Sequence, residues 1–285
     1  MNEKIEKVSL IKIILHSVMA VLIVFVCYRV LIEFMPESYS NLAPSLIQLT
    51  MNLAFICIIK NQLNKNNIRL FEITGKIQVK PKEMALYIWG IILKLLLSFT
   101  FLFSLIRIAI VFIGSEPIIS ELLLDTSDSS SGLGIGTLIA TVFLAPIVEE
   151  LIFRGILLNK WTMKMSNKKA LFWSALLFGI LHFDSFVIPQ LLGGLLYGMA
   201  YLKTKKLIYP IVLHVINNAA LVLLLALPES EFKVENMVEA ARELIFALNI
   251  SSAGFLISLL LFGWFVYKIG KDINNEQAPY LVHSK

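Results

Sequence analysis

Apolar runs separated by short polar segments dominate the chain. Runs of about 17–25 apolar residues are typical of membrane-spanning helices, and eight segments have this character. The third is longer than a span requires, and the fifth and sixth are short and meet at Pro189. The eight predicted spans are 11–35, 42–59, 84–114, 134–158, 170–187, 188–203, 207–227 and 245–267. The pattern therefore predicts an all-α, polytopic membrane protein built as a bundle of eight transmembrane helices.

Composition supports the membrane assignment. Of the 285 residues, 58% are hydrophobic and 16% are charged, whereas soluble domains are close to half apolar and a quarter charged. The net charge of +5 is explained by basic cytoplasmic loops, so we expect no nucleic-acid partner. Cys27 and Cys57 are predicted to lie at different depths, and we expect no disulfide between them.

The distribution of basic residues predicts the orientation in the membrane. If the N-terminal side is the inner side, 19 of the 25 Lys and Arg residues lie in inner segments, and the outer loops hold only Lys233 and Arg242. Basic loops face the cytoplasm, so both termini of this multi-pass protein are predicted to be cytoplasmic, in a cell membrane. Frequent Ile, Lys and Asn favour a low-GC bacterium as the source.

An acidic outer loop, 115–133, divides the chain. It contains no Lys or Arg and ends in a Ser- and Asp-rich segment of the kind that forms linkers. We predict three regions. Residues 1–133 hold the first three spans, residues 134–228 form a core with spans four to seven, and residues 229–285 hold an outer loop, the eighth span and a cytoplasmic tail.

The fourth predicted span carries two adjacent glutamates, Glu149 and Glu150. A carboxylate at membrane depth costs at least about 2.5 kcal/mol on insertion scales. Glu150 and Arg154 are four residues apart in the acid-first order that favours an ion pair, so we assign this pair a structural role. Adjacent helical positions diverge by about 100°, which leaves Glu149 facing elsewhere.

Polar residues from two other spans are predicted to lie near the depth of Glu149. At a rise of 1.5 Å per residue from the inner ends, Glu149, His182 and Asn218 lie about 15, 18 and 16 Å deep, and His214 about 10 Å deep. One such group is often only a contact between helices, worth about 0.6 kcal/mol. Four in one layer indicate a site. Lys94, in the third span, has no predicted partner.

This set of side chains favours hydrolysis by activated water. The chain has no G-x-S-x-G, no Cys near the histidines and no H-E-x-x-H, and its spans hold no pair of aspartates. These absences argue against the common serine and cysteine nucleophiles, a standard zincin and a two-aspartate protease. A carboxylate and a histidine can activate water, and a second histidine with an amide can stabilise an oxyanion.

Three motifs of the core occur in order: Glu149-Glu150-x-x-Phe153-Arg154-Gly155, Phe178-x-x-x-His182 and His214-x-x-x-Asn218. Over about 134–220 the chain therefore resembles the CAAX protease and bacteriocin-processing family of intramembrane endopeptidases, which includes the type II CAAX prenyl endopeptidases. The resemblance implies an eight-helix peptidase with a conical cavity facing the cytoplasm. It implies Glu149 as the general base, His182 positioning the water, and His214 with Asn218 as the oxyanion site. Glu150, Arg154 and Phe178 would support them.

The resemblance also bears on cofactors and partners. The implied mechanism requires no cofactor. If zinc were bound, Glu149, His182 and His214 would be its ligands, since zinc accepts carboxylate and imidazole donors. The expected substrate is a hydrophobic or lipid-anchored peptide presented among membrane lipids.

Two other functions remain open from the sequence. A non-catalytic scaffold or bacteriocin-immunity protein would bind a partner membrane protein and keep the polar layer only for packing; the intact motifs argue against it. A transporter has less support, because inverted repeats and paired broken helices are not apparent.

Overall fold

The computed structural model describes residues 4–34, 42–113, 134–183, 187–225 and 237–284. Within these ranges every regular element is a helix, so the predicted all-α class is confirmed. The elements are α1 (Lys4–Lys7), α2 (Leu10–Phe34), α3 (Ala43–Lys65), α4 (Leu70–Thr74), α5 (Pro81–Ile113), α7 (Ile135–Ile139), η3 (Ala140–Leu144), α8 (Ala145–Glu150), η4 (Leu151–Leu158), α9 (Asn159–Thr162), α10 (Asn167–Ile180), α11 (Val187–Thr204), α12 (Ile208–Leu225), α13 (Met237–Gly270), η5 (Ile273–Asn275) and α14 (Pro279–His283).

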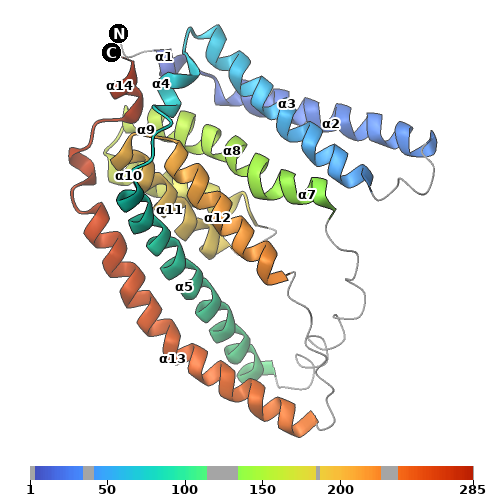
Figure 1. Ribbon diagram of the computed structural model, residues 1–285, viewed down its shortest axis with the longest axis vertical. Helices are drawn as coiled ribbons and strands as arrows, with labels where there is room; N and C mark the ends of the chain where they lie inside the picture. Colours follow the sequence, from blue (N-terminus) through green and yellow to red (C-terminus); the bar gives the residue numbers. More distant parts are fainter. Residues whose placement is uncertain (1–3, 35–41, 114–133, 184–186, 226–236, 285) are drawn as a thin grey trace.

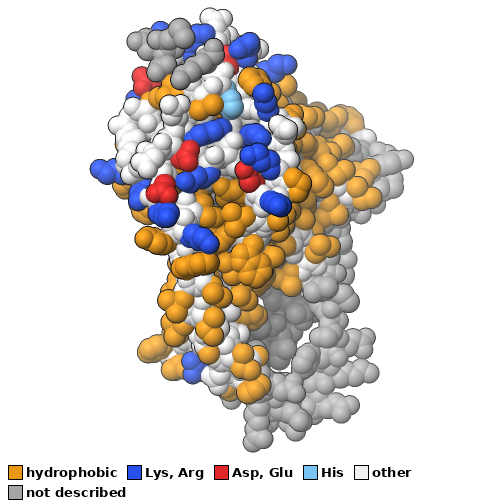
Figure 2. Space-filling view, turned by 60° about the vertical axis from the view of Figure 1, so that its left-hand side comes forward, with side chains coloured by type: hydrophobic (Ala, Val, Ile, Leu, Met, Phe, Trp, Pro, Cys, Tyr) orange, Lys and Arg blue, Asp and Glu red, His pale blue; other side chains and the backbone are white. Residues whose placement is uncertain are grey.

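Five helical stretches are long and apolar enough to cross a membrane: Leu10–Phe34, Ala43–Lys65, Pro81–Phe112, Ile135–Thr162 and Ile245–Asn275. Figure 2 shows hydrophobic side chains covering the long lower part of the molecule and charged side chains gathered at its upper end. Exposed apolar surface of this extent is suited to lipid rather than water. The chain is therefore a multi-pass membrane protein.

Every predicted span overlaps a helix, but the described helices do not confirm the count of eight spans. Helix α12 is a shorter apolar helix over Ile208–Leu224. Helix α10 has 14 residues and so extends about 21 Å, less than the roughly 30 Å thickness of the hydrocarbon core. Helices α10 and α11 pack closely side by side. The structure thus supports five of the eight predicted spans by length and composition.

The fourth predicted span is one continuous helix from α7 to α9, and its hydrogen bonding changes twice. Two π-helical segments, η3 and η4, flank the short helix α8 that carries both glutamates. Pro146, in the first turn of α8, has no N–H to donate to the preceding turn, which helps to explain the change of pitch at η3. π-helical segments inside α-helices are frequent at functional sites.

The packing brings distant parts of the chain together. Helices α5 and α13 run side by side for most of their length (Figure 1), so the first and third predicted regions share an interface. The predicted linker 115–133 lies outside the described residues, and the division into three regions stays a prediction. Helix α14 packs against α4, and α1 lies at the same end of the molecule (Figure 1).

Candidate catalytic site

Glu149, His182 and His214 converge from three parts of the fold. Glu149 comes from α8 and His214 from α12. His182 lies two residues beyond the end of α10, in a turn closed by its own N–H donating to the Gly179 carbonyl, so it lies outside the helix although it falls within the predicted span 170–187. Glu149 Oε2 lies 3.6 Å from His182 Nε2 and 3.8 Å from His214 Nε2.

The hydrogen bonds of the two imidazoles define which nitrogen faces Glu149. His182 Nδ1 lies 2.7 Å from the Phe178 carbonyl oxygen, and His214 Nδ1 lies 2.9 Å from Glu150 Oε1. Carbonyl and carboxylate oxygens only accept, so each Nδ1 is the donor and carries a hydrogen. Both Nε2 atoms are then directed at Glu149.

Glu149 Oε2 is buried and makes no direct hydrogen bond within the described residues, although the Glu149 side chain as a whole is 26% exposed. Its separations from the two Nε2 atoms exceed the usual 2.7–3.2 Å of a direct hydrogen bond. Polar groups at such a separation are commonly bridged by water. The carboxylate of Glu149 and the two imidazoles are therefore close enough to act on the same small polar group.

The ion pair predicted from spacing forms. Arg154 Nη1 donates to Glu150 Oε1 at 2.9 Å, and both side chains are fully buried. Arg154 Nη2 also donates to the Gly194 carbonyl oxygen at 3.0 Å. Glu150 Oε1 accepts from His214 as well, so Glu150 orients His214 in addition to pairing with Arg154. Sequence reasoning missed this contact, because it links two helices whose relative rotation is not visible in helical spacing.

Aromatic rings enclose the imidazoles. Tyr197 stacks on His214, with ring centroids 4.8 Å apart and planes 20° from parallel. Phe178 lies 4.5 Å from the His182 ring and beneath the Arg154 guanidinium, at 4.7 Å. Sequence reasoning identified Phe178 from its motif and missed Tyr197, because a tyrosine in an apolar run carries no distinguishing signal.

Asn218 lies one turn beyond His214 on α12 and belongs to a separate set of hydrogen bonds. Its Nδ2 donates to the Thr141 carbonyl oxygen at 3.0 Å, and its Oδ1 accepts from Asn217 Nδ2 at 3.3 Å. Asn217 Oδ1 in turn accepts from the buried Lys94 Nζ at 2.8 Å. The lysine that had no predicted partner is thus linked to the predicted oxyanion residue.

Within the described ranges, no group of three or more His, Cys, Asp or Glu side chains is arranged to hold a metal ion. Zinc ligation by Glu149, His182 and His214 stays a prediction.

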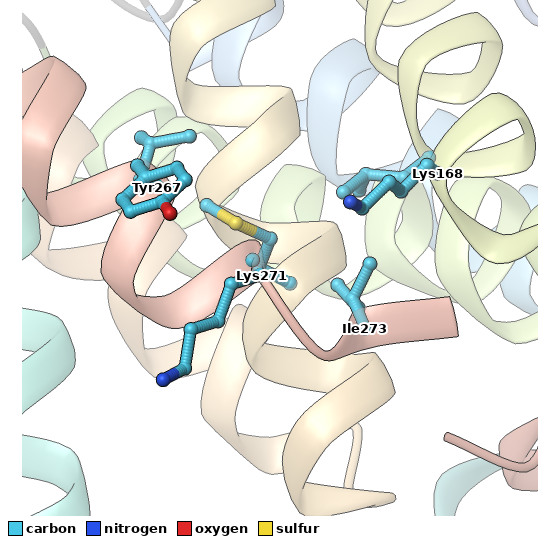
Figure 3. Close-up of a pocket in the computed structure, with 8 residues that line it drawn as sticks. Lys168, Tyr267, Lys271 and Ile273 are labelled. Atoms are coloured by element: carbon cyan, nitrogen blue, oxygen red, sulfur yellow. The ribbon is translucent and has the colours of Figure 1, made fainter. Parts of the chain in front are cut away.

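A pocket of about 420 Å³ opens where α10, α11 and α13 meet (Figure 3). Its lining includes Lys168, Tyr267, Lys271 and Ile273 and contains no carboxylate or imidazole. In Figure 3 the Lys271 side chain extends away from Lys168. This pocket therefore lacks the carboxylate and imidazoles that the Glu149 cluster brings together. The predicted conical cavity facing the cytoplasm stays a prediction.

Comparison with known proteins finds similarity over the segment that carries the motifs. Residues 131–220 match the family described as type II CAAX prenyl endopeptidase Rce1-like. The membrane-embedded CAAX protease MroQ of Staphylococcus aureus (strain USA300) is 28% identical over 87 residues, which cover 28% of this chain and 35% of that protein. Among solved structures, none matches the chain. The resemblance to CAAX proteases is confirmed over this segment, which spans about a third of the curated relative.

Proposed function

We propose that the chain is an intramembrane endopeptidase that hydrolyses a peptide bond of a hydrophobic or lipid-anchored peptide close to the membrane surface. The observation that carries the proposal is the approach of both imidazole Nε2 atoms to Glu149 Oε2, at 3.6 and 3.8 Å. This cluster lies inside the segment that is similar to CAAX proteases. A cluster kept only for packing would not need two imidazoles directed at one carboxylate oxygen.

In the proposed reaction, Glu149 takes a proton from a water molecule that His182 Nε2 helps to hold. The water oxygen attacks the carbonyl carbon of the peptide bond and forms a tetrahedral intermediate. Collapse of the intermediate breaks the carbon–nitrogen bond, and Glu149 returns the proton to the departing amine. A general base of this kind contributes about 100- to 10,000-fold to the rate.

His214 and Asn218 are proposed to stabilise the oxyanion of the intermediate. A doubly protonated His214 would carry a hydrogen on each ring nitrogen, so that Nδ1–H donates to the Glu150 carboxylate while Nε2–H donates to the oxyanion. The side-chain amide of Asn218 has two N–H groups, and the bond to Thr141 uses one. The other is proposed to donate to the oxyanion.

The apolar outer surface supports a substrate that arrives within the membrane. Large apolar side chains are exposed along the helices, among them Leu22 of α2, Trp89 of α5 and Leu260 of α13. Surfaces of this kind contact lipid, and a hydrophobic or acylated peptide would share that environment.

The test compares peptides from cells that carry the wild-type protein with those from cells that carry Glu149→Ala, His182→Ala or His214→Ala. Each substitution is expected to abolish cleavage of the same peptides while the protein stays folded in the membrane. Glu33→Ala, an exposed glutamate on α2, is the matched control and should cleave normally. Normal cleavage by Glu149→Ala would refute the mechanism, and full complementation of a deletion strain by that variant would favour the partner-binding alternative. Cleavage with and without a metal chelator tests for zinc.

A further inference from the structure

Lys94 is buried in the middle of α5, with 2% of the residue exposed. A lysine ammonium is expensive to hold away from water. Its Nζ donates to Asn217 Oδ1 at 2.8 Å, and Asn217 is itself buried at 1% exposure. The mechanism above makes no use of Lys94, so its position calls for a separate explanation.

Lys94 is the first donor in a chain of hydrogen bonds in which each side chain donates to the next. An ammonium group only donates, so the Asn217 amide must turn its oxygen toward α5 and its Nδ2 toward Asn218. Asn218 must then present its oxygen to Asn217. Its Nδ2 points the opposite way and donates to the Thr141 carbonyl oxygen, which only accepts. A donor-only group at one end and an acceptor-only group at the other fix both amides in one orientation.

We propose that Lys94 is a positioning residue for the oxyanion site. Through Asn217 it fixes and polarises the side-chain amide of Asn218, so that the second N–H of Asn218 is held ready to donate to the oxyanion. Successive hydrogen bonds strengthen one another in a low-dielectric interior, and the positive charge of Lys94 lies at the donor end. This inference rests on the proposed function, because it assigns Asn218 to the oxyanion.

The first test is Lys94→Met, which keeps an unbranched apolar chain of similar length and removes the terminal ammonium, with its charge and its donors. Removal of an oxyanion donor reduces kcat by about 100- to 1,000-fold, so loss of its positioning group is expected to reduce kcat by about 10-fold, with KM nearly unchanged. The substitution removes the cost of a buried charge but leaves the buried Asn217 Oδ1 without its donor; because these two effects oppose each other, the melting temperature should change little. Lys94→Arg, which retains a donor-only cation, should recover part of the lost activity.

The second test is Asn217→Asp, which gives Lys94 a stronger partner and removes the N–H that Asn218 accepts. Two acceptors would then face each other, and the Asn218 amide would have to turn its nitrogen away from Thr141. The melting temperature is expected to stay the same or rise while kcat falls by about 10-fold or more. A residue that serves only for packing would not separate stability from activity in this way.

Two controls show whether Lys94 acts through Asn218. Thr100→Val removes another buried polar contact of α5, the 2.9 Å contact with Ser258, and should leave kcat unchanged. In an Asn218→Ala background, Lys94→Met should have no further effect on kcat.

Three outcomes would overturn the inference. Lys94→Met could keep the wild-type kcat, its loss of activity could follow a loss of stability, or the effects of Lys94→Met and Asn218→Ala on kcat could multiply independently. These outcomes are distinct from failure of the proposed function, which would appear as normal cleavage by Glu149→Ala.

Discussion

Arg154 holds three elements of the candidate site together. It donates to Glu150 on α8 and to the Gly194 carbonyl oxygen on α11, and it lies over the ring of Phe178 on α10. Arg154→Ala would leave the buried Glu150 carboxylate without its cation, which is expected to cost about 3–5 kcal/mol of folding free energy. Thermal unfolding of the purified protein in detergent measures this loss.

Replacing the whole pair separates charge balance from packing. The double substitution Glu150→Leu with Arg154→Met removes both charges and should recover much of the lost stability. It should still be inactive, because His214 loses the acceptor that orients its Nδ1. Wild-type stability of Arg154→Ala alone would contradict the structural role of the pair.

Residue contacts within one helix could be predicted from the sequence, whereas contacts between helices could not. The spacing of Glu150 and Arg154 predicted an ion pair that forms. Two contacts were not predicted: the stacking of Tyr197 on His214 and the hydrogen bond from Lys94 to Asn217. Each of them joins two different helices. They depend on the rotation and axial position of each helix, which follow from packing of the whole bundle and leave no periodic signal in the chain.

At the scale of elements, close packing of α10 on α11 depends on glycine. A Cβ atom on Gly194 would lie 3.0 Å from Ala175 Cα and 3.3 Å from the Ala175 carbonyl oxygen, backbone atoms that cannot rotate away. Gly194→Ala is therefore expected to destabilise the protein by about 1–3 kcal/mol. It should also reduce cleavage, because α10 positions the turn that carries His182.

The matched control for this prediction is Gly263→Ala on α13. Apart from the adjacent backbone of α13 itself, no described atom lies within 4 Å of a Cβ placed there, and alanine is more favourable than glycine in a helix by about 1 kcal/mol. This variant should be as stable as the wild type or more stable, with normal cleavage. Equal effects of the two substitutions would show that helix propensity, not the contact with Ala175, determines the result.

Hydropathy predicted the elements well and their ends less well. Each apolar run became a helix, because a buried or lipid-facing backbone must satisfy its own hydrogen bonds. The run 170–187 ends as a helix at Ile180, and His182 lies in the turn beyond it. The π-helical segments around Glu149 were also missed, because a change in hydrogen-bond register does not alter the hydrophobicity of the run.

At the scale of the whole molecule, most of the charged side chains lie at the same end as the helices nearest the two chain termini. Helices α1 and α14 lie at one end of the bundle, where the charged side chains also concentrate (Figures 1 and 2). Lys205 and Lys203 at the end of α11 pair with Glu276 of the C-terminal segment, at 3.0 and 3.3 Å. The excess of basic residues in the inner segments predicts that this end faces the cytoplasm.

Thiol labelling in intact cells tests this orientation. The two native cysteines, Cys27 and Cys57, are free and exposed and are first replaced by serine. In that background, Lys76→Cys lies in an exposed part of an inner segment, and Ser129→Cys lies in the loop 115–133 that is predicted to be outside. A membrane-impermeant maleimide should label Ser129→Cys at once and Lys76→Cys only after the cells are permeabilised. The reverse pattern would put the charged end outside the cell and would contradict a substrate that reaches Glu149 from the cytoplasmic side.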